Sequence, residues 1–172
     1  VVDFSWIVAG PTTTRMLADF GSEVIRVENE QTLDVIRNVP PVKSGSSPNT
    51  GGMFNNLNRN KLGITLNVMH PDGMDLLHDL IAISDFVVEN FSSSVLERWG
   101  LDYESQRKIR PDIIYLSLSG FGHSGRDRHF TTWGPTAQAL SGLTHMSGLP
   151  NHEPAGWGFS YMDQTAGYYG AM

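Results

Sequence analysis

Asp163 stands in an unusually aromatic part of the sequence, and its surroundings make it the first candidate for chemistry. The aromatic residues around it are Trp133, Trp157, Phe159, Tyr161, Tyr168 and Tyr169. Because Asp163 directly precedes the helix-like segment QTAGYYGAM, the simplest interpretation is a helix N-cap beside a packed core. A helix N-terminus also favours the charged form of a carboxyl group. The alternative is a nucleophilic carboxylate held among apolar walls and stripped of water.

The composition removes the more familiar nucleophiles for acyl transfer. The chain has no cysteine and no G-x-S-x-G sequence, so neither a thiolate nor a serine elbow is available. A carboxyl group with an ordinary pKa of about 3.9 is almost fully ionised near pH 7 and needs no partner base. Acidic side chains are therefore the remaining candidates.

The segment Gly120–Gly125 (GFGHSG) matches G-x-G-x-x-G after a predicted strand, a pattern associated with dinucleotide binding. In that pattern a helix opens at the third glycine, whereas the polar segment RDRHFTTWGP follows here. We interpret the glycines instead as a flexible turn that lets the backbone approach a ligand.

The six histidines show no zinc-site spacing with one another or with acidic residues. The sequence therefore predicts no metal site. His123 and His129 lie in the glycine-bearing loop, where chemistry could occur, but a surface or hydrogen-bonded role is the simpler interpretation of each histidine.

Predicted strands and helices alternate along the chain, which indicates a parallel sheet. Residues 1–8 form a strand, Gly10-Pro11 introduces a helix that ends at Gly21, and residues 24–27 form the next strand. Further strands are predicted at 64–68, 86–90 and 113–118, the last with the continuous apolar character of a buried strand. Helices are predicted at 70–84, 92–100 and 103–110.

Residues 30–60 are rich in Pro, Gly, Ser and Asn, including Pro40-Pro41 and the run 44–49 (SGSSPN). We expect a long loop without regular structure. Such a loop inside a compact domain is usually functional or disordered, so a surface excursion and a substrate lid both stay open.

Length, charge and hydropathy restrict the class of protein. A chain of 172 residues with 40% hydrophobic content can bury one core, so a single compact domain is expected. The net charge of −6 opposes binding to nucleic acid or anionic membranes, and no apolar run is long enough for a membrane helix. No signal peptide is evident, and the lack of cysteine is compatible with a reducing compartment, so we expect a cytoplasmic protein. The last residues fall inside a predicted apolar helix, which suggests a cut chain.

Five segments together resemble family III CoA-transferases, which include formyl-CoA transferase and carnitine CoA-transferase. They are DFS with VAGPTTTRMLADFGSEVIRVE, then NRNKLGITLN, VVENFSSSVLERWGLDYE, IIYLSLSGFGHSG and TAQALSGL. The resemblance covers nearly the whole chain except residues 30–55. It identifies the G-x-G-x-x-G match with the SGFG segment of that family, so no nicotinamide is implied.

The resemblance implies an α/β fold, with a Rossmann-like parallel sheet and flanking helices. Residues 1–172 would be the N-terminal portion of the large domain, with the C-terminal half and a small domain absent and two subunits interlocked as a homodimer. The implied reaction moves CoA between an acyl-CoA thioester and a free carboxylic acid, through an aspartyl-acyl mixed anhydride on Asp163. Coenzyme A takes part as the acyl-CoA substrate, and no metal is implied.

The resemblance also implies further site residues. Contacts with CoA are expected from Arg59, Asn60, Lys61, Asn90 and Arg98, and a substrate pocket from Trp133, Gln138, Trp157 and Tyr161. Arginine and lysine are natural partners for the CoA phosphates. The alternatives are solvated surface cations, for Lys61 in particular, and core packing for the aromatic residues.

Two departures and two alternatives accompany this resemblance. Val8 stands where some members have Gln, and Asn29 where some have Arg, so oxyanion or nucleotide contacts are not carried over to these positions.

The first alternative is the α-methylacyl-CoA racemase branch, whose catalytic His lies eight residues before a Ser-Gly dipeptide. Here Ser141-Gly142 puts Trp133 at that place, and Trp cannot act as a general base, while His129 is four residues away from it. The second alternative is an inactive or truncated subunit that serves as a scaffold.

Overall fold

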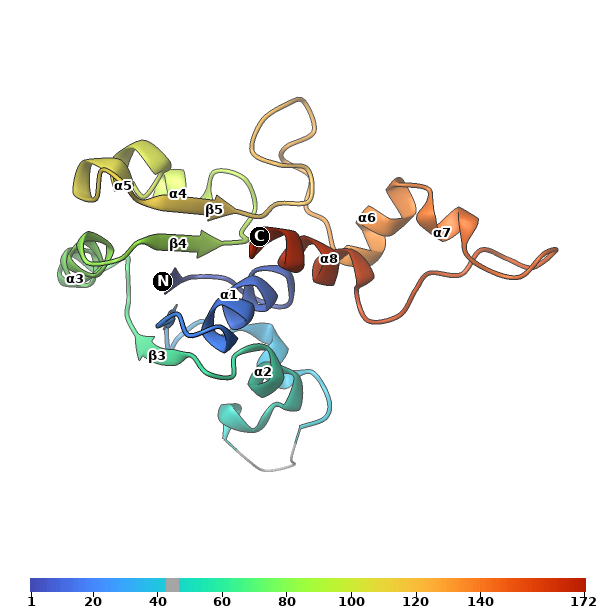
Figure 1. Ribbon diagram of the computed structural model, residues 1–172, viewed down its shortest axis with the longest axis horizontal. Coiled ribbons are helices and arrows are strands. Elements are labelled where there is room, and N and C mark those ends of the chain that lie inside the picture. Colours follow the sequence, from blue (N-terminus) through green and yellow to red (C-terminus); the bar gives the residue numbers. More distant parts are fainter. Residues whose placement is uncertain (43–46) are drawn as a thin grey trace.

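A five-stranded parallel sheet forms the centre of the protein in the computed structural model, which describes residues 1–42 and 47–172 (Figure 1). Its strands are β1 (Val2–Asp3), β2 (Ile25–Glu28), β3 (Leu62–Thr65), β4 (Phe86–Glu89) and β5 (Ile114–Ser117). The spatial order is β3-β2-β1-β4-β5, and every neighbouring pair is parallel. The predicted α/β fold with a parallel sheet is therefore confirmed, and the strand order reverses between β1 and β4.

Helices connect the strands and cover the sheet. They are α1 (Ala9–Asp19), α2 (Gly52–Leu57), α3 (Pro71–Ala82), α4 (Val95–Arg98), α5 (Tyr103–Ile109), α6 (Gly134–Leu140), α7 (Leu143–Met146) and α8 (Tyr161–Gly170), with the short 3-10 helices η1 (Val35–Asn38) and η2 (Pro48–Thr50). Figure 1 shows α8 beside α1, whereas α6, α7 and the loop after them extend away from the sheet. Among the described residues, no helix is long and apolar enough to cross a membrane.

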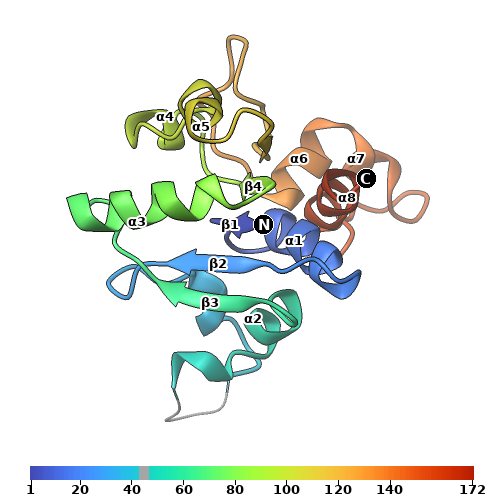
Figure 2. The same ribbon diagram turned by 60° about the vertical axis from the view of Figure 1, so that its left-hand side comes forward.

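Different helices cover the two faces of the sheet. Successive residues of a strand point to opposite faces, so the contacts of Val2 and Asp3 show which helix lies on each face. Val2 belongs to a hydrophobic cluster that includes Leu77 and Ile81 of α3. Its neighbour Asp3 accepts a hydrogen bond from the Thr14 hydroxyl of α1 at 2.7 Å. Helices α3 and α1 therefore lie on opposite faces, as in a doubly wound sheet. Figure 2 shows β2 and β3 side by side below α3.

The first and last strands differ from the sequence prediction. The strand predicted over residues 1–8 is only Val2–Asp3, because Asp3 Oδ1 accepts the Ser5 N–H at 2.9 Å and the chain turns before α1. The buried strand predicted at 113–118 is an edge strand, where Ile114 is 61% exposed. An apolar sequence alone does not distinguish the centre of a sheet from its edge.

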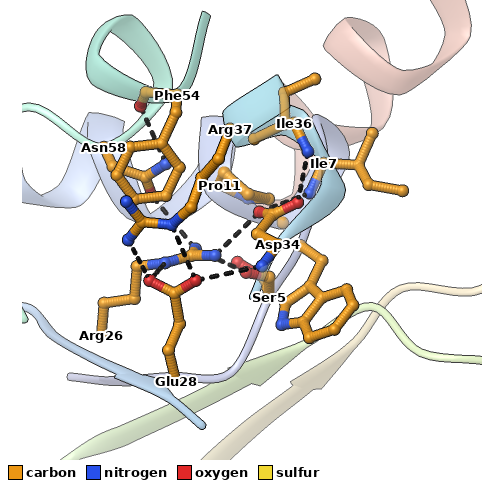
Figure 3. A network of polar contacts seen from close by, with 12 residues as sticks. Ser5, Ile7, Pro11, Arg26, Glu28, Asp34, Ile36, Arg37, Phe54 and Asn58 are labelled. Atoms are coloured by element: carbon orange, nitrogen blue, oxygen red, sulfur yellow. Dashed lines mark hydrogen bonds and ion pairs between the residues drawn. The ribbon is translucent and has the colours of Figure 1, made fainter. Parts of the chain in front are cut away.

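The expectation of a loop without regular structure at residues 30–60 is wrong, since η1, η2 and α2 lie there. Part of the run 44–49 falls outside the described residues. Figure 3 shows the buried polar network that holds this segment against β2. Arg26 pairs with Asp34 at 2.8 Å, and the Arg37 guanidinium pairs with Glu28 and lies 3.5 Å from the ring centre of Phe54. Charged side chains in a segment rich in loop-forming residues gave no periodic signal, so sequence patterns could not reveal these helices.

Candidate active site

A cavity of about 410 Å³ opens where strands β1, β4 and β5 end. Its lining includes the segments that follow these strands, at residues 6–9, 90–92 and 118–120. Residues 130–134 and the α8 residues Met162, Asp163 and Ala166 line it as well. Open α/β sheets bind ligands outside the carboxyl ends of their strands, at the point where the strand order reverses. The cavity lies at that point.

Asn90 joins the two strand ends on either side of the reversal. Its Oδ1 accepts the Trp6 N–H at 2.7 Å, and its Nδ2 donates to the Trp6 carbonyl at 2.8 Å. Ile7, which follows Trp6 in the chain, has a left-handed backbone with φ 68°, which is unusual for a β-branched residue. The Ile7 N–H donates to Asp34 Oδ2 at 3.0 Å, so the network of Figure 3 also supports this turn. Two side chains from distant segments thus fix the backbone on this wall of the cavity.

Helix α1 begins at the same wall and presents its N-terminus to the cavity. Val8 is the N-cap residue and has no side-chain cap, and both Val8 and Ala9 line the cavity. The Thr12 N–H is bonded to the Val8 carbonyl at 2.9 Å, so the earlier N–H groups have no acceptor within the helix. These N–H groups can bind an oxygen atom that becomes negatively charged.

Asp163 is brought to the opposite wall by the first turn of α8. Its Oδ2 accepts the N–H of Gly134 at 3.0 Å. Burial raises the pKa of this carboxyl group above its usual value, although hydrogen bonds from Ser160 and the Gly134 N–H act in the other direction. The sequence prediction that Asp163 is the N-cap is wrong, because the helix begins at Tyr161 and Ser160 occupies that position. Desolvation therefore outweighs the charge stabilisation expected from the helix terminus.

Close contact with α1 fixes the position of α8. The Thr13 hydroxyl donates to the Gly167 carbonyl at 2.9 Å, and the Thr12 hydroxyl donates to Gln164 at 3.3 Å. A Cβ at Gly167 would lie 2.6 Å from Thr12 Cβ, so only glycine allows this approach. The helix that presents its N-terminus to the cavity therefore also carries the helix that bears Asp163.

The four residues expected in the substrate pocket lie in different surroundings. Trp133 lines the cavity together with Asp163. Trp157 and Tyr161 are half-exposed and contact each other edge to face, with ring centres 4.4 Å apart, away from the cavity lining. Gln138 is buried on α6, and neither of its amide atoms has a hydrogen-bond partner among the described residues.

The apolar part of the cavity wall comes largely from residues that sequence reasoning did not select. They include Trp6, Phe91, Leu118 and Phe130. Trp6, Phe91 and Leu118 lie within three residues of a strand end. The signal that could have found them is their position directly after predicted strands on both sides of the reversal.

Of the residues expected to contact CoA, Asn90 lines the cavity, whereas the others lie outside its lining. Arg98 is exposed at the end of α4. Arg59 and Asn60 both bond to Asp19, with an Arg59 Nη2 to Oδ2 distance of 2.6 Å, and the Arg59 side chain is 48% exposed. Arg59 and Arg98 are thus accessible cations.

Lys61 occupies a different environment from these two arginines. Its side chain is 1% exposed, and its Nζ pairs with Asp3 at 3.0 Å and donates to the Pro11 carbonyl at 3.2 Å. Burial lowers the pKa of Lys61, and the charge of Asp3 acts against that change. The alternative of a solvated surface cation is therefore wrong for Lys61, which joins α1 to the sheet.

The segment Gly120–Gly125 opens no helix and continues as a loop to α6, which agrees with the rejection of a dinucleotide-binding pattern. Gly122 and Gly125 have positive φ angles of 72° and 88°, as a glycine turn requires. His123 contacts Ser117, and within residues 1–42 and 47–172 no histidine lines the cavity. The same part of the chain holds no group of three His, Cys, Asp or Glu residues that could bind a metal ion.

Comparison with known proteins places these features in a family context. The model of CoA-transferase family III matches residues 1–172. The chain is 37% identical to an acyl-CoA transferase from Fusarium pseudograminearum and 35% identical to a succinate–glutarate CoA-transferase from Agrobacterium fabrum, in each case over 98% of this chain. It covers 38% and 43% of those two proteins, so it spans less than half the length of the relatives it matches.

Solved structures agree with this assignment of the fold. A CAIB/BAIF family protein from Brucella suis superposes with a TM-score of 0.91 at 34% identity, over 99% of this chain and 45% of that protein. A hypothetical protein from Mycobacterium tuberculosis superposes with a TM-score of 0.86 at 27% identity, again over 99% of this chain and 45% of the other.

Proposed function

The chain belongs to CoA-transferase family III, and on this premise we propose that the intact protein moves CoA between an acyl-CoA thioester and a free carboxylic acid, with Asp163 as the nucleophile. One observation carries the proposal. The Asp163 carboxyl group lines the cavity at the strand-order reversal, and no other carboxylate of the described residues does so. A carboxylate is a competent covalent nucleophile toward an activated acyl group.

In the proposed reaction a carboxylate oxygen of Asp163 attacks the thioester carbonyl carbon. A carbon–oxygen bond forms, the carbon–sulfur bond breaks, and CoA leaves as the thiolate from a mixed anhydride. Net transfer requires the thiolate to return to the aspartyl carbonyl, which releases the donor acid and leaves CoA as an aspartyl thioester. The acceptor carboxylate then attacks that thioester, and the thiolate finally takes the acceptor acyl group and frees Asp163.

The walls of the cavity support this chemistry in three ways. Apolar side chains such as Trp6, Phe91 and Leu118 keep water from an anhydride that water would hydrolyse. The burial that raises the pKa of Asp163 also removes hydration from the carboxylate, which makes it a stronger nucleophile. The unpaired N–H groups at the start of α1 can stabilise the oxyanion that forms when the thioester is attacked.

The CoA contacts are part of the proposal. Asn90 lines the cavity together with Asp163. Arg59, Asn60 and Arg98 lie outside the cavity lining, and we propose that they bind the phosphates of CoA. Lys61 can take part only if its buried ion pair with Asp3 opens.

The acceptor acid is proposed to bind near Trp133, with Gln138, Trp157 and Tyr161 as further pocket residues. We also propose that the intact protein is an interlocked cytoplasmic homodimer. Exposed apolar side chains such as Leu140 of α6, Met146 of α7 and Tyr169 of α8 are consistent with further contacts in an assembly. Size-exclusion chromatography with light scattering measures the mass directly, and a monomer would contradict the dimer.

Exchange kinetics test the proposed function. Asp163→Asn keeps the size of the side chain, but a neutral amide cannot form the anhydride. With succinyl-CoA and glutarate as the first probes, followed by a panel of monocarboxylic acids, turnover should fall more than about 1,000-fold while acyl-CoA affinity stays within a few-fold. The exposed Glu153→Gln is the matched control. Retention within about tenfold, a barrier change of only about 1.4 kcal/mol, would refute the nucleophilic role.

Running the assay in deuterated water, so that α-proton exchange is measured beside CoA transfer, separates the two alternatives. A racemase would exchange the α-proton of an acyl-CoA without transferring CoA, and a scaffold subunit would do neither.

A further inference from the structure

A backbone N–H group holds the carboxylate of Asp163 in place. Gly134 is the first residue of α6, and Trp133 before it provides no side-chain cap. First-turn N–H groups have no acceptor within their own helix. The N–H of Gly134 finds one in Asp163 Oδ2, at 3.0 Å.

The absence of a side chain at Gly134 makes this contact possible. A Cβ built there would lie 2.2 Å from Asp163 Oδ2, 2.9 Å from Asp163 Cγ and 3.1 Å from Ser160 Cβ. The first two distances are shorter than any contact that real Cβ atoms make, so any other residue would displace the carboxylate.

The chain before Asp163 is bent toward Gly134. Phe159 and Ser160 have positive φ angles of 57° and 48°, a left-handed conformation that non-glycine residues adopt only when the surroundings require it. Two such residues in succession lead directly into the first turn of α8. Backbone strain of this kind concentrates where a functional group must be held in a defined orientation.

We propose that Gly134 is a positioning residue for the covalent steps, so this inference rests on the proposed role of Asp163. With Oδ2 held by the Gly134 N–H, Oδ1 is the oxygen that attacks the thioester and becomes the bridging oxygen of the anhydride. Oδ2 then becomes the aspartyl carbonyl oxygen. When the thiolate attacks that carbonyl, the negative charge develops on Oδ2, directly in front of the same N–H donor.

The variant Gly134→Ala tests this inference in the intact protein. Its added Cβ displaces the carboxylate, and a misplacement of about 1 Å lowers the rate of a positioned reaction about 100-fold. We expect that loss in single-turnover acylation by succinyl-CoA, with CoA affinity changed less than about threefold. The midpoint of the acylation rate against pH should move to higher pH, because a lost hydrogen bond to the carboxylate raises its pKa.

Gly158→Ala is the matched control. Gly158 lies in the loop before α8, a Cβ there meets no atom within 4 Å, and its φ is not positive. This variant should acylate within about threefold of the wild type, with an unchanged pH midpoint. If Gly134→Ala is acylated at the same rate and with the same pH midpoint as Gly158→Ala, the proposal is overturned.

A melting-temperature cycle keeps the inference testable if Gly134→Ala folds poorly. The two shortest distances of the clash are to the Asp163 carboxylate, so Gly134→Ala should lower the melting temperature much less in an Asp163→Ala background than in the wild type. Equal losses in the two backgrounds would overturn the contact. This cycle measures no activity, so its result is independent of the exchange assay with Asp163→Asn, which tests the nucleophile itself.

Discussion

Replacement of Arg37 by Met removes a cation that neutralises a buried carboxylate in the network of Figure 3. Arg37 and Glu28 are both 8% exposed, and Arg37 Nε donates to Glu28 Oε1 at 3.2 Å. Met is similar in length and can still pack on Phe54, so the variant loses charge and hydrogen bonds more than volume. Glu28 would retain Arg26, whose Nε forms an ion pair at 3.3 Å without hydrogen-bond geometry.

The expected loss follows from these contacts. Removal of one partner of a buried ion pair costs about 3–5 kcal/mol. Because Arg26 remains, we expect the lower end, about 3 kcal/mol. The matched control is Arg107→Met, whose half-exposed side chain is 4.0 Å from Glu104, and it should lose less than about 1 kcal/mol.

The pH dependence gives a second test of the same variant. Burial acts to raise the pKa of Glu28, but the hydrogen bonds from Arg37 and the charge of Arg26 outweigh it and hold the pKa below its ordinary value. A carboxylate with a lowered folded pKa contributes stability above its unfolded pKa of about 4.3, and that stability is lost as the pH falls through the folded pKa. The difference between wild type and Arg37→Met should therefore be full at pH 7 and narrow below about pH 4.

Urea unfolding of the intact protein at several pH values measures both effects. Equal losses for Arg37→Met and Arg107→Met at pH 7 would refute the assignment of stability to this network. If the stability difference between wild type and Arg37→Met is the same at pH 7 as below pH 4, the role of the Glu28 charge is refuted.

Two further predictions concern the helices and rings around the site. Gly167→Ala places a Cβ 2.6 Å from Thr12 Cβ, so it should push α8 away from α1. We expect stability to fall by about 1–3 kcal/mol and turnover to decrease. Gly63→Ala, whose added Cβ meets no atom within 4 Å, is the control and should change neither stability nor turnover. Thermal melts and exchange assays would show this, and a fully active Gly167→Ala would contradict the docking of α8. Trp157→Ala should reduce kcat/KM selectively for aromatic or onium-bearing acids, and equal losses for all acids with a lower melting temperature would exclude a specificity role.

The order of the elements could be predicted from the sequence because each strand and helix carries its own local signal. The βαβ start and the helix over residues 71–82 follow from Pro and Gly positions and from apolar periodicity. The backbone of the turn after β1 is also held by Asn90, which is distant in the sequence. No pattern within residues 1–8 contains that information.

The candidate site was predictable only in part for the same reason. Aromatic density and family resemblance pointed to Asp163, and the structure brings Trp133 and Asn90 to the same cavity. The contact of Gly134 with Asp163 and the burial of Lys61 beside Asp3 arise from tertiary approach between distant segments. A glycine before a proline, or a lysine before a strand, looks ordinary in a single sequence.

Covalent trapping tests the central claim most directly. Intact protein is incubated with succinyl-CoA and hydroxylamine, digested, and analysed by peptide mass spectrometry. Hydroxylamine attacks an aspartyl anhydride or aspartyl thioester at the aspartyl carbonyl and leaves a stable hydroxamate, so the wild type should carry that modification on Asp163 and Asp163→Asn should not. A hydroxamate on another residue, or active enzyme that never acquires one on Asp163, would contradict the account.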